Sequence, residues 1–248
     1  MSDFLSGPDF YDYEEIFDVY MNHRLNRPET PNDTMEKPVI WELMGDVSDQ
    51  KVLDLGCGDG RFGLALLDAG ARSYLGIDGS INMIEIAKKN LESSTATVQH
   101  ISLETWIYPA NRFDLVVSRL VLHYIDDINR VFKHVYQTLD NNGRFVFSIE
   151  HPVITSSERR WEGKGKRQDW LVDNYFNSGC RENSWLGGKV VKYHRTIEQI
   201  FGGLQDAGFT VKSLREATPI RENFISKETF ERRQRIPLFL IVSATKNK

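Results

Sequence analysis

Acidic residues and glycines are grouped in one short stretch in a way that favours a nucleoside ligand. Residues 51–63 read KVLDLGCGDGRFG, so Asp54 precedes glycines at positions 56, 58 and 60. Glycine adopts positive φ at little cost and lets a ligand approach the backbone closely. A second acid, Asp78, follows 22 residues after Gly56, near the roughly 20-residue offset of a ribose-binding acid in a βαβ unit. The pattern predicts a ribose beside Asp78 and a cationic group beside Asp54.

The elements around this stretch would place both acids at one edge of a sheet. Residues 51–55 are short and apolar, which predicts a buried strand, and residues 61–70 predict a helix that stops at Gly70. Residues 73–78 predict the next strand, and Ser80 is a good N-cap for the helix after it. The glycine turn would then face the free N–H groups of a helix N-terminus.

The same alternation continues along most of the chain. Asp126 and Asp127 can cap a helix that runs to about residue 139, and Thr196 with Gln199 forms a capping box for another. Further strands are expected at 98–101, 113–118, 144–150, 209–215 and 236–245. Strands separated by helices imply a mostly parallel sheet with right-handed connections.

Two segments do not follow this rhythm. Residues 1–45 predict helices at 11–24 and 35–44, and residues 151–195 are aromatic, charged and without clear periodicity. A long irregular stretch in a compact domain is usually a lid or a binding loop. We therefore predict a single domain over 1–248, with 1–45 as a helical N-terminal cap and 151–195 as a substrate or lid insertion.

Composition narrows the class of protein. The chain has 248 residues, 40% of them hydrophobic, with a net charge of −4 and two cysteines. Without a basic run, a nucleic-acid partner is not expected, and the cysteine spacing predicts neither disulfides nor a metal site. Without a run of 18 apolar residues or a signal peptide, we expect a cytoplasmic protein with no membrane partner, as a monomer or homodimer.

Four motifs resemble a known family. DLGCGDG at 54–60 resembles motif I of the Rossmann-like (class I) S-adenosylmethionine (SAM)-dependent methyltransferases, and FDLVVS at 113–118 resembles the fourth strand of that family. Residues 150–152 (EHP) and 193–196 (YHRT) resemble a bacterial small-molecule subgroup. The resemblance implies an α/β, doubly wound, seven-stranded sheet with the last strand antiparallel, SAM as cofactor and S-adenosylhomocysteine as product.

The resemblance also implies roles for individual residues. In the family the glycine turn holds the methionine part of SAM, an apolar residue at the position of Met83 contacts adenine, and an N-terminal segment closes over the cofactor. Ser102 replaces the usual aspartate, so Glu104 or the backbone is expected to contact adenine. The implied cofactor-binding set is Tyr20, Arg24, Asp54, Gly56, Cys57, Gly58, Asp78, Gly79, Met83, Leu103, Glu104, Ser118 and Arg119.

The methyl-transfer chemistry would need positioning and, for a hydroxyl or a protonated amine, a general base. Because ligands of such sheets lie beyond the carboxyl ends of the strands, three histidines are candidates for that base: His151, His194 and His123. We predict transfer of a methyl group to an O or N atom of a small molecule.

Two other functions remain open from the sequence. The pattern G-x-G-x-x-G occurs at residues 58–63, which would suit an NAD(P)-dependent oxidoreductase. A methyltransferase acting on a macromolecule is the other alternative.

Overall fold

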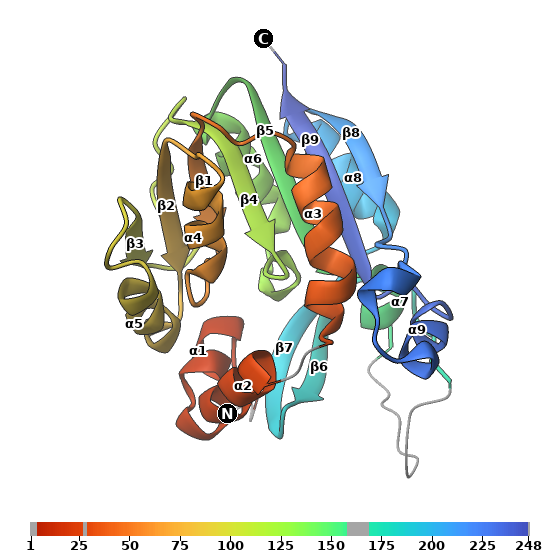
Figure 1. Ribbon diagram of the computed structural model, residues 1–248. Helices are drawn as coiled ribbons and strands as arrows, with labels where there is room; N and C mark the ends of the chain where they lie inside the picture. Colours follow the sequence, from red (N-terminus) through yellow and green to blue (C-terminus); the bar gives the residue numbers. More distant parts are fainter. Residues whose placement is uncertain (1–3, 27–28, 158–168, 248) are drawn as a thin grey trace.

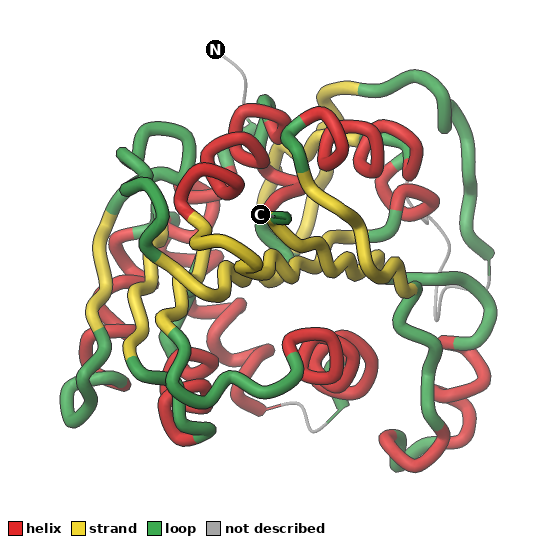
Figure 2. Tube along the Cα trace, turned by 90° about the horizontal axis from the view of Figure 1, so that it is seen from above, coloured by secondary structure: helices red, strands yellow, loops and turns green. Residues whose placement is uncertain are grey.

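The protein is built around a twisted seven-stranded sheet with helices on both faces (Figures 1 and 2). The computed structural model describes residues 4–26, 29–157 and 169–247, without the side chains of residues 24–26. The strands are β1 (Lys51–Leu55), β2 (Ser73–Asp78), β3 (Thr97–His100), β4 (Phe113–Arg119), β5 (Leu139–Glu150), β8 (Phe209–Arg215) and β9 (Phe239–Lys246).

The strand order is β3-β2-β1-β4-β5-β9-β8. Strands β1 to β5 pair in parallel, while β9 is antiparallel to both β5 and β8. The expected Rossmann-like sheet, with the last strand antiparallel, is thereby confirmed. The chain runs outward from β1 to β3 and then returns beside β1 as β4, so a ligand crevice is expected at the carboxyl ends of β1 and β4.

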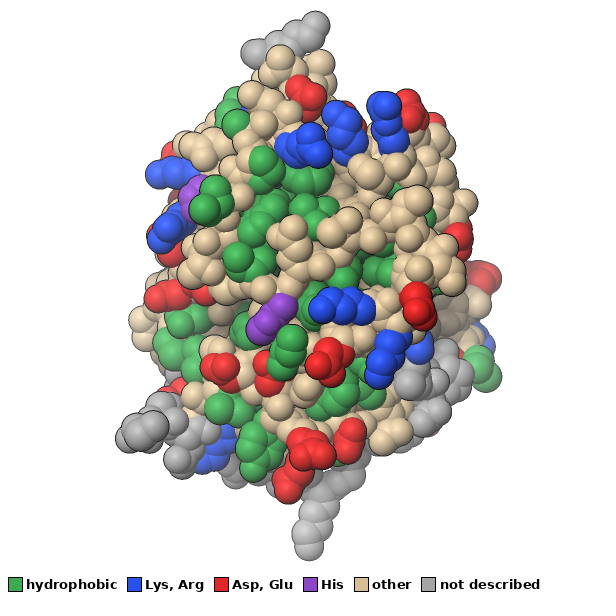
Figure 3. Space-filling view, turned by 90° about the vertical axis from the view of Figure 1, so that its left-hand side faces the viewer, with side chains coloured by type: hydrophobic (Ala, Val, Ile, Leu, Met, Phe, Trp, Pro, Cys, Tyr) green, Lys and Arg blue, Asp and Glu red, His purple; other side chains and the backbone are tan. Residues whose placement is uncertain are grey.

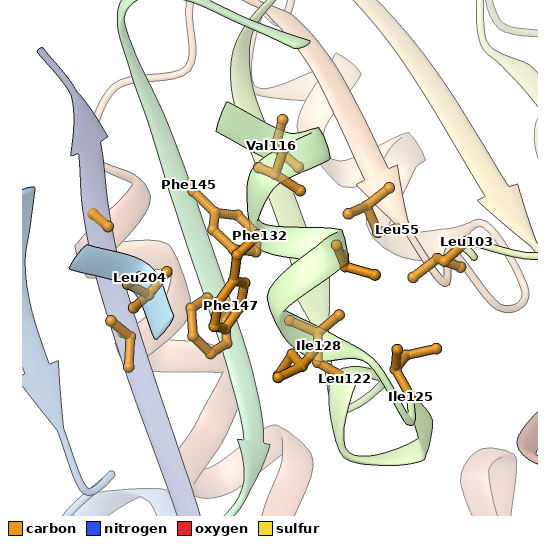
Figure 4. Packing of buried hydrophobic residues seen from close by; sticks show 14 of the residues in the cluster. Leu55, Leu103, Val116, Leu122, Ile125, Ile128, Phe132, Phe145, Phe147 and Leu204 are labelled. Atoms are coloured by element: carbon orange, nitrogen blue, oxygen red, sulfur yellow. The ribbon is translucent and has the colours of Figure 1, made fainter. Parts of the chain in front are cut away.

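Alternate residues of the central strands pack against different helices. Leu53 and Leu55 of β1 join the core that contains α6 (Ile128–Thr138) and α8 (Ile197–Asp206), whereas Val52 faces α3 (Lys37–Met44), α4 (Arg61–Asp68) and α5 (Ile81–Asn90). Figure 4 shows Phe132 of α6 against Phe145 and Phe147 of β5. Burial on both faces explains why these strands are almost continuously apolar.

A separate layer lies beyond the carboxyl ends of the parallel strands. It consists of residues 4–26, with α1 (Gly7–Asp12) and α2 (Glu14–Asn26), and the hairpin of β6 (Gly179–Trp185) and β7 (Gly188–His194); we call it the cover. Leu5 pairs with Val190 of β7, and Phe10, Ile16 and Val190 form its own small core. Figure 1 shows the arrowheads of β2 and β4 pointing toward the cover.

The remaining elements are short. They are the π-helical turn η1 (Asn32–Glu36), the 3-10 turns η2 (Leu122–Tyr124) and η3 (Arg221–Asn223), and the helices α7 (Pro152–Thr155) and α9 (Lys227–Arg233). Among the helices within the described ranges, none combines the length and apolar character needed to cross a bilayer.

Three expectations about elements were wrong. The helix expected over 11–24 breaks at Tyr13, which is extended, so that two helices result. The stretch 151–195 contains the β6–β7 hairpin, whose turn residues Leu186 and Gly187 both have positive φ. That is type I′ geometry, which leucine rarely adopts, so the turn lacks the Asn-Gly or Asp-Gly pair that usually marks such a hairpin. Strand β5 begins at residue 139 rather than 144, because Asn142 at φ 61° continues it through an irregularity.

Candidate active site

A cavity of about 450 Å³ opens between the carboxyl ends of the strands and the cover. Its walls come from both layers. The seven-stranded sheet with its flanking helices, which we call the body, contributes residues at the ends of β1, β2, β4 and β5. The cover contributes residues of α1, α2 and β6. The cavity therefore lies at the topological switch point between β1 and β4, as expected for a ligand site of this sheet type.

Asp54 lies at the end of β1 and is 2% exposed. Its Oδ2 accepts a hydrogen bond of 2.8 Å from the Tyr74 hydroxyl, while its buried Oδ1 has no protein partner among the described residues. Burial raises the pKa of this carboxyl to about 7, although Tyr74 and Arg119 act in the opposite direction. A buried carboxylate oxygen without a donor, on the wall of a cavity, is suited to a cationic ligand.

The glycine turn is held in place by the second acid. Asp78 Oδ2 accepts from the Gly58 N–H and its Oδ1 from the Ser80 N–H, both at 2.9 Å. Gly56 and Gly58 have φ of 78° and 54°. A Cβ on Gly56 would lie 2.3 Å from Val121, whereas one on Gly58 would meet no described protein atom within 4 Å. Gly58 therefore presents bare backbone to the cavity.

Arg119 at the end of β4 is held at the cavity wall by an ion pair with Glu36. Its guanidinium forms an ion pair with Glu36, which is fully buried and also accepts from the Ser148 hydroxyl at 2.7 Å. The guanidinium carbon lies 4.4 Å from the centre of the Phe62 ring. The π-helical turn that carries Glu36 thus fixes the cation at the cavity wall.

The α1 helix of the cover is attached to the body at the end of the cavity near β2 and α5. The Asp12 carboxylate of α1 accepts bonds from the Ser80 hydroxyl at 2.5 Å and from the Asn82 N–H at 3.1 Å, at the N-terminus of α5. A Cβ on Gly79 would lie 2.6 Å from Pro8. This contact joins α1 directly to the turn after Asp78.

Most of the predicted cofactor residues come together. The structure does not place Ser118 with them, because its hydroxyl donates to the Leu55 carbonyl at 2.8 Å inside the sheet. The side chain of Arg24 lies outside the described residues. The predicted residues that line the cavity are Tyr20, Asp54, Gly56, Cys57, Gly58, Asp78, Gly79, Met83, Leu103, Glu104 and Arg119.

Two of the three histidines lie away from the cavity. Both ring nitrogens of His194 are engaged, Nδ1 with Thr155 and Nε2 with the Tyr175 carbonyl, each at 2.8 Å. His151 Nδ1 accepts from the Val153 N–H at 3.2 Å and caps α7, and its Nε2 lies 3.1 Å from Glu216. Neither is among the lining residues, so their geometry is that of structural histidines.

His123 does line the cavity, but its chemistry is unsuited to a base. Its Nδ1 accepts from the Glu150 N–H at 3.4 Å, and burial lowers the pKa of the ring to about 3. The imidazole therefore stays neutral and accepts protons poorly near neutral pH.

Several residues of the cavity wall are outside the predicted set of catalytic and cofactor-binding residues, although the sequence placed Glu150 at a strand end and Trp185 in the predicted substrate insertion 151–195. These are aromatic residues of the cover and of η2, together with the carboxylate that ends β5. The position of Glu150 at a strand end was a usable signal, whereas only the fold brings the rings together. The residues are Tyr11, Tyr124, Glu150 and Trp185.

The chain resembles methyltransferases in both sequence and fold. Residues 52–143 match the family model described as a methyltransferase domain. A structure from Listeria monocytogenes, assigned to the SAM-dependent methyltransferases, is 34% identical, with a TM-score of 0.79 over 86% of this chain and 97% of that one. A SAM-dependent methyltransferase from Mesorhizobium loti is 33% identical, with a TM-score of 0.78 over 85% and 97%.

A curated relative with a named activity extends this likeness. The demethylmenaquinone methyltransferase of Lactococcus lactis is 28% identical over 174 residues, which cover 67% of this chain and 68% of that one. Together with the two solved structures, which match over nearly their whole length, these similarities establish that the chain belongs to the class I SAM-dependent methyltransferases.

Proposed function

We propose that this SAM-dependent methyltransferase moves the methyl group to an O or N atom of a small molecule. The observation that carries the proposal is the cavity, which is covered on the side opposite the strand ends and has a volume of about 450 Å³. Small-molecule sites in proteins have volumes of about 300–1,000 Å³. A space of this size, bounded by the cover, suits a cofactor with a small acceptor better than a polypeptide or a duplex.

The residues of the β1–β2 half fit SAM. The unpartnered Asp54 oxygen suits the ammonium group of the methionine part, and the open backbone at Gly58 suits its close approach. Asp78 would accept the ribose hydroxyls, since each carboxylate oxygen retains a second lone pair. Met83 and Leu103, both buried at the wall, would contact the adenine.

The remaining half of the cavity would hold the acceptor. It lies over β4 and β5, where Tyr124 and Glu150 meet Tyr11, Tyr20 and Trp185 of the cover. The sulfonium of SAM supplies an activated methyl group, so the protein has to align the nucleophile and exclude water. The cover is placed to do both, and the name of the Lactococcus lactis relative is consistent with a small acceptor.

The test is transfer from SAM labelled in the methyl group, incubated with enzyme and a cell extract that is then separated by size. We expect the label to enter the low-molecular-weight fraction, where mass spectrometry identifies a product heavier by one methylene. Label found only in the protein or nucleic-acid fraction would replace this proposal by the macromolecular alternative.

Asp78→Ala is expected to weaken SAM binding by about tenfold or more, because charge-assisted hydrogen bonds contribute about 1.5–3 kcal/mol each. The variant also removes the acceptor for Gly58 and Ser80, so circular dichroism must show that the fold persists. Calorimetric affinity equal to that of the wild type would remove Asp78 from the site.

Cofactor binding is expected to slow amide hydrogen exchange in α1 and in the β6–β7 hairpin. Both belong to the cover and both contribute to the cavity wall, and covers of this kind commonly close on binding. The measurement is exchange mass spectrometry with and without S-adenosylhomocysteine, with α9 as a comparison away from the cavity. Equal protection in α9 and the cover would argue against a specific closure.

A further inference from the structure

We propose that the acceptor presents an amino group to Glu150, within a wall formed by the four aromatic residues Tyr11, Tyr20, Tyr124 and Trp185, which we call the aromatic wall. This inference rests on the proposed function, because it concerns the acceptor half of the same cavity. It narrows the acceptor to amines that carry no phosphate or carboxylate.

The aromatic wall is assembled from three parts of the chain. Tyr11 and Tyr20 come from α1 and α2, Trp185 ends β6, and Tyr124 lies in η2 of the body. The centre of the Tyr11 ring lies 5.0 Å from that of Tyr20, 6.3 Å from that of Tyr124 and 6.2 Å from that of Trp185. All four line the cavity. Aromatic rings that converge in this way favour cations and planar groups.

The charged residues of the cavity wall are mostly acidic. Arg119 is the sole basic side chain among the described lining residues other than neutral His123. Arg119 is paired with Glu36, and Glu150 of the wall is likewise paired with Lys192, which lies outside the cavity lining. The ammonium and sulfonium groups of SAM account for part of this excess. Acidic side chains also gather in the lower part of the face shown in Figure 3. The acidic lining residues are Asp9, Asp54, Asp59, Asp78, Glu104 and Glu150. Such a wall repels anionic acceptors.

Glu150 is the carboxylate at the acceptor end. It closes β5, two strands away from β1 in the sheet order β1-β4-β5. Its Oε1 accepts from Lys192 Nζ at 2.6 Å, and the Glu150 side chain is 27% exposed. Lys192 is 8% exposed and does not line the cavity. Lys192 thus pairs with the carboxylate from outside the cavity lining, while Glu150 itself lines the cavity.

The position of Lys192 shows which chemistry this part of the protein accommodates. Its ammonium lies 5.6 Å from the centre of the Tyr124 ring and 5.8 Å from that of Trp185. Both distances are within the roughly 6 Å range of a cation–π contact. Glu150 and two rings of the aromatic wall thus already hold one primary ammonium, that of Lys192, from outside the cavity. In this proposal the acceptor amine meets the same groups from the cavity side.

The test compares three probes of similar size on enzyme saturated with S-adenosylhomocysteine. By calorimetry we expect phenethylamine to bind at least about tenfold more tightly than 2-phenylethanol, and 3-phenylpropionate to bind most weakly, since a charge-assisted contact exceeds a neutral one by about that ratio. Carboxylate binding equal to or tighter than amine binding would overturn the proposal, as would binding of none of the three probes.

Variants separate Glu150 from the general acidity of the cavity. Glu150→Gln should lower phenethylamine affinity about tenfold and leave 2-phenylethanol unchanged, whereas the control Glu42→Gln, at an exposed glutamate paired with Arg215, should change neither. An unchanged amine affinity in Glu150→Gln contradicts the assignment. The ranking of the three probes is measured on the wild-type enzyme, so it tests the proposal even if the Glu150→Gln variant does not fold. If the wild-type enzyme does not bind S-adenosylhomocysteine, the proposed function is contradicted. If it binds S-adenosylhomocysteine but ranks the three probes differently, only this inference is contradicted.

Discussion

Gly58→Val is expected to lower SAM affinity by about 100-fold, the ratio that ~2.8 kcal/mol of overlap and strain produces. The reason is the open space above Gly58: a Cβ there would meet no described protein atom within 4 Å, and Gly58 lines the cavity, so a larger side chain would extend into the space of the cofactor. The measurement is calorimetric titration with SAM, together with the circular dichroism of the unbound variant. Because the Gly58 φ is 54°, a valine there also costs the fold about 1–2 kcal/mol.

Gly70→Val is the matched control. Gly70 has a φ of 93°, follows the opposite end of α4 and leaves ordinary contact distances to Ser48. The Gly70→Val variant should lose about as much folding stability as Gly58→Val and should keep the SAM affinity of the wild type. Normal binding by Gly58→Val would mean that the turn shapes the protein without touching the cofactor.

SAM affinity is expected to fall as the pH falls through about 7. Burial raises the pKa of the Asp54 carboxyl to about 7, and nearby Asp78 and Asp59 raise it further. A cationic ligand selects the ionised carboxylate, so below this pH binding must first remove a proton. The affinity should then drop by about tenfold for each pH unit. Burial also raises the pKa of Asp78, which adds to the effect in the same direction.

The measurement is calorimetry at pH 5.5 to 8.5 in two buffers of different ionisation enthalpy, which reports the protons released on binding. Asp54→Asn serves as the comparison, since it keeps the size of the side chain and cannot ionise. We expect weaker binding by this variant at pH 8 and a flatter pH profile. An identical pH profile in both proteins would assign the effect to another group.

The sheet could be predicted because its strands carry their own signals. Residues 51–55 and 113–119 are buried on both faces and therefore read as apolar runs. Ser80, Asp127 and Thr196 cap their helices as expected. The β6–β7 hairpin was missed because its stability comes from contacts with residues far away in the chain, such as Leu5 with Val190.

The β1–β2 half of the cavity, where we propose that SAM binds, could be located from the sequence for a related reason. Asp54, Gly58 and Asp78 are local to two adjacent βα units, so the sequence spacing fixes where they meet. The half of the cavity over β4 and β5, where we propose that the acceptor binds, is made of residues from distant segments, and Tyr11 lies 113 positions before Tyr124. Histidines were favoured there because of their chemistry, but His151 and His194 are engaged by local backbone and side-chain partners, which spacing alone does not reveal.

The pairing of Leu5 with Val190 also bears on synthesis of the chain. The Leu5 N–H donates to the Lys189 carbonyl at 3.1 Å, and the Leu5 carbonyl accepts from Val191. Leu5 leaves the ribosome before its partners Lys189 and Val191, which follow 184 and 186 positions later in the chain. Contacts this distant in sequence form late and slowly. A nascent chain can therefore assemble β1 to β5 before β7 has been synthesised. During this time the aromatic residues of α1 and α2 remain exposed to solvent.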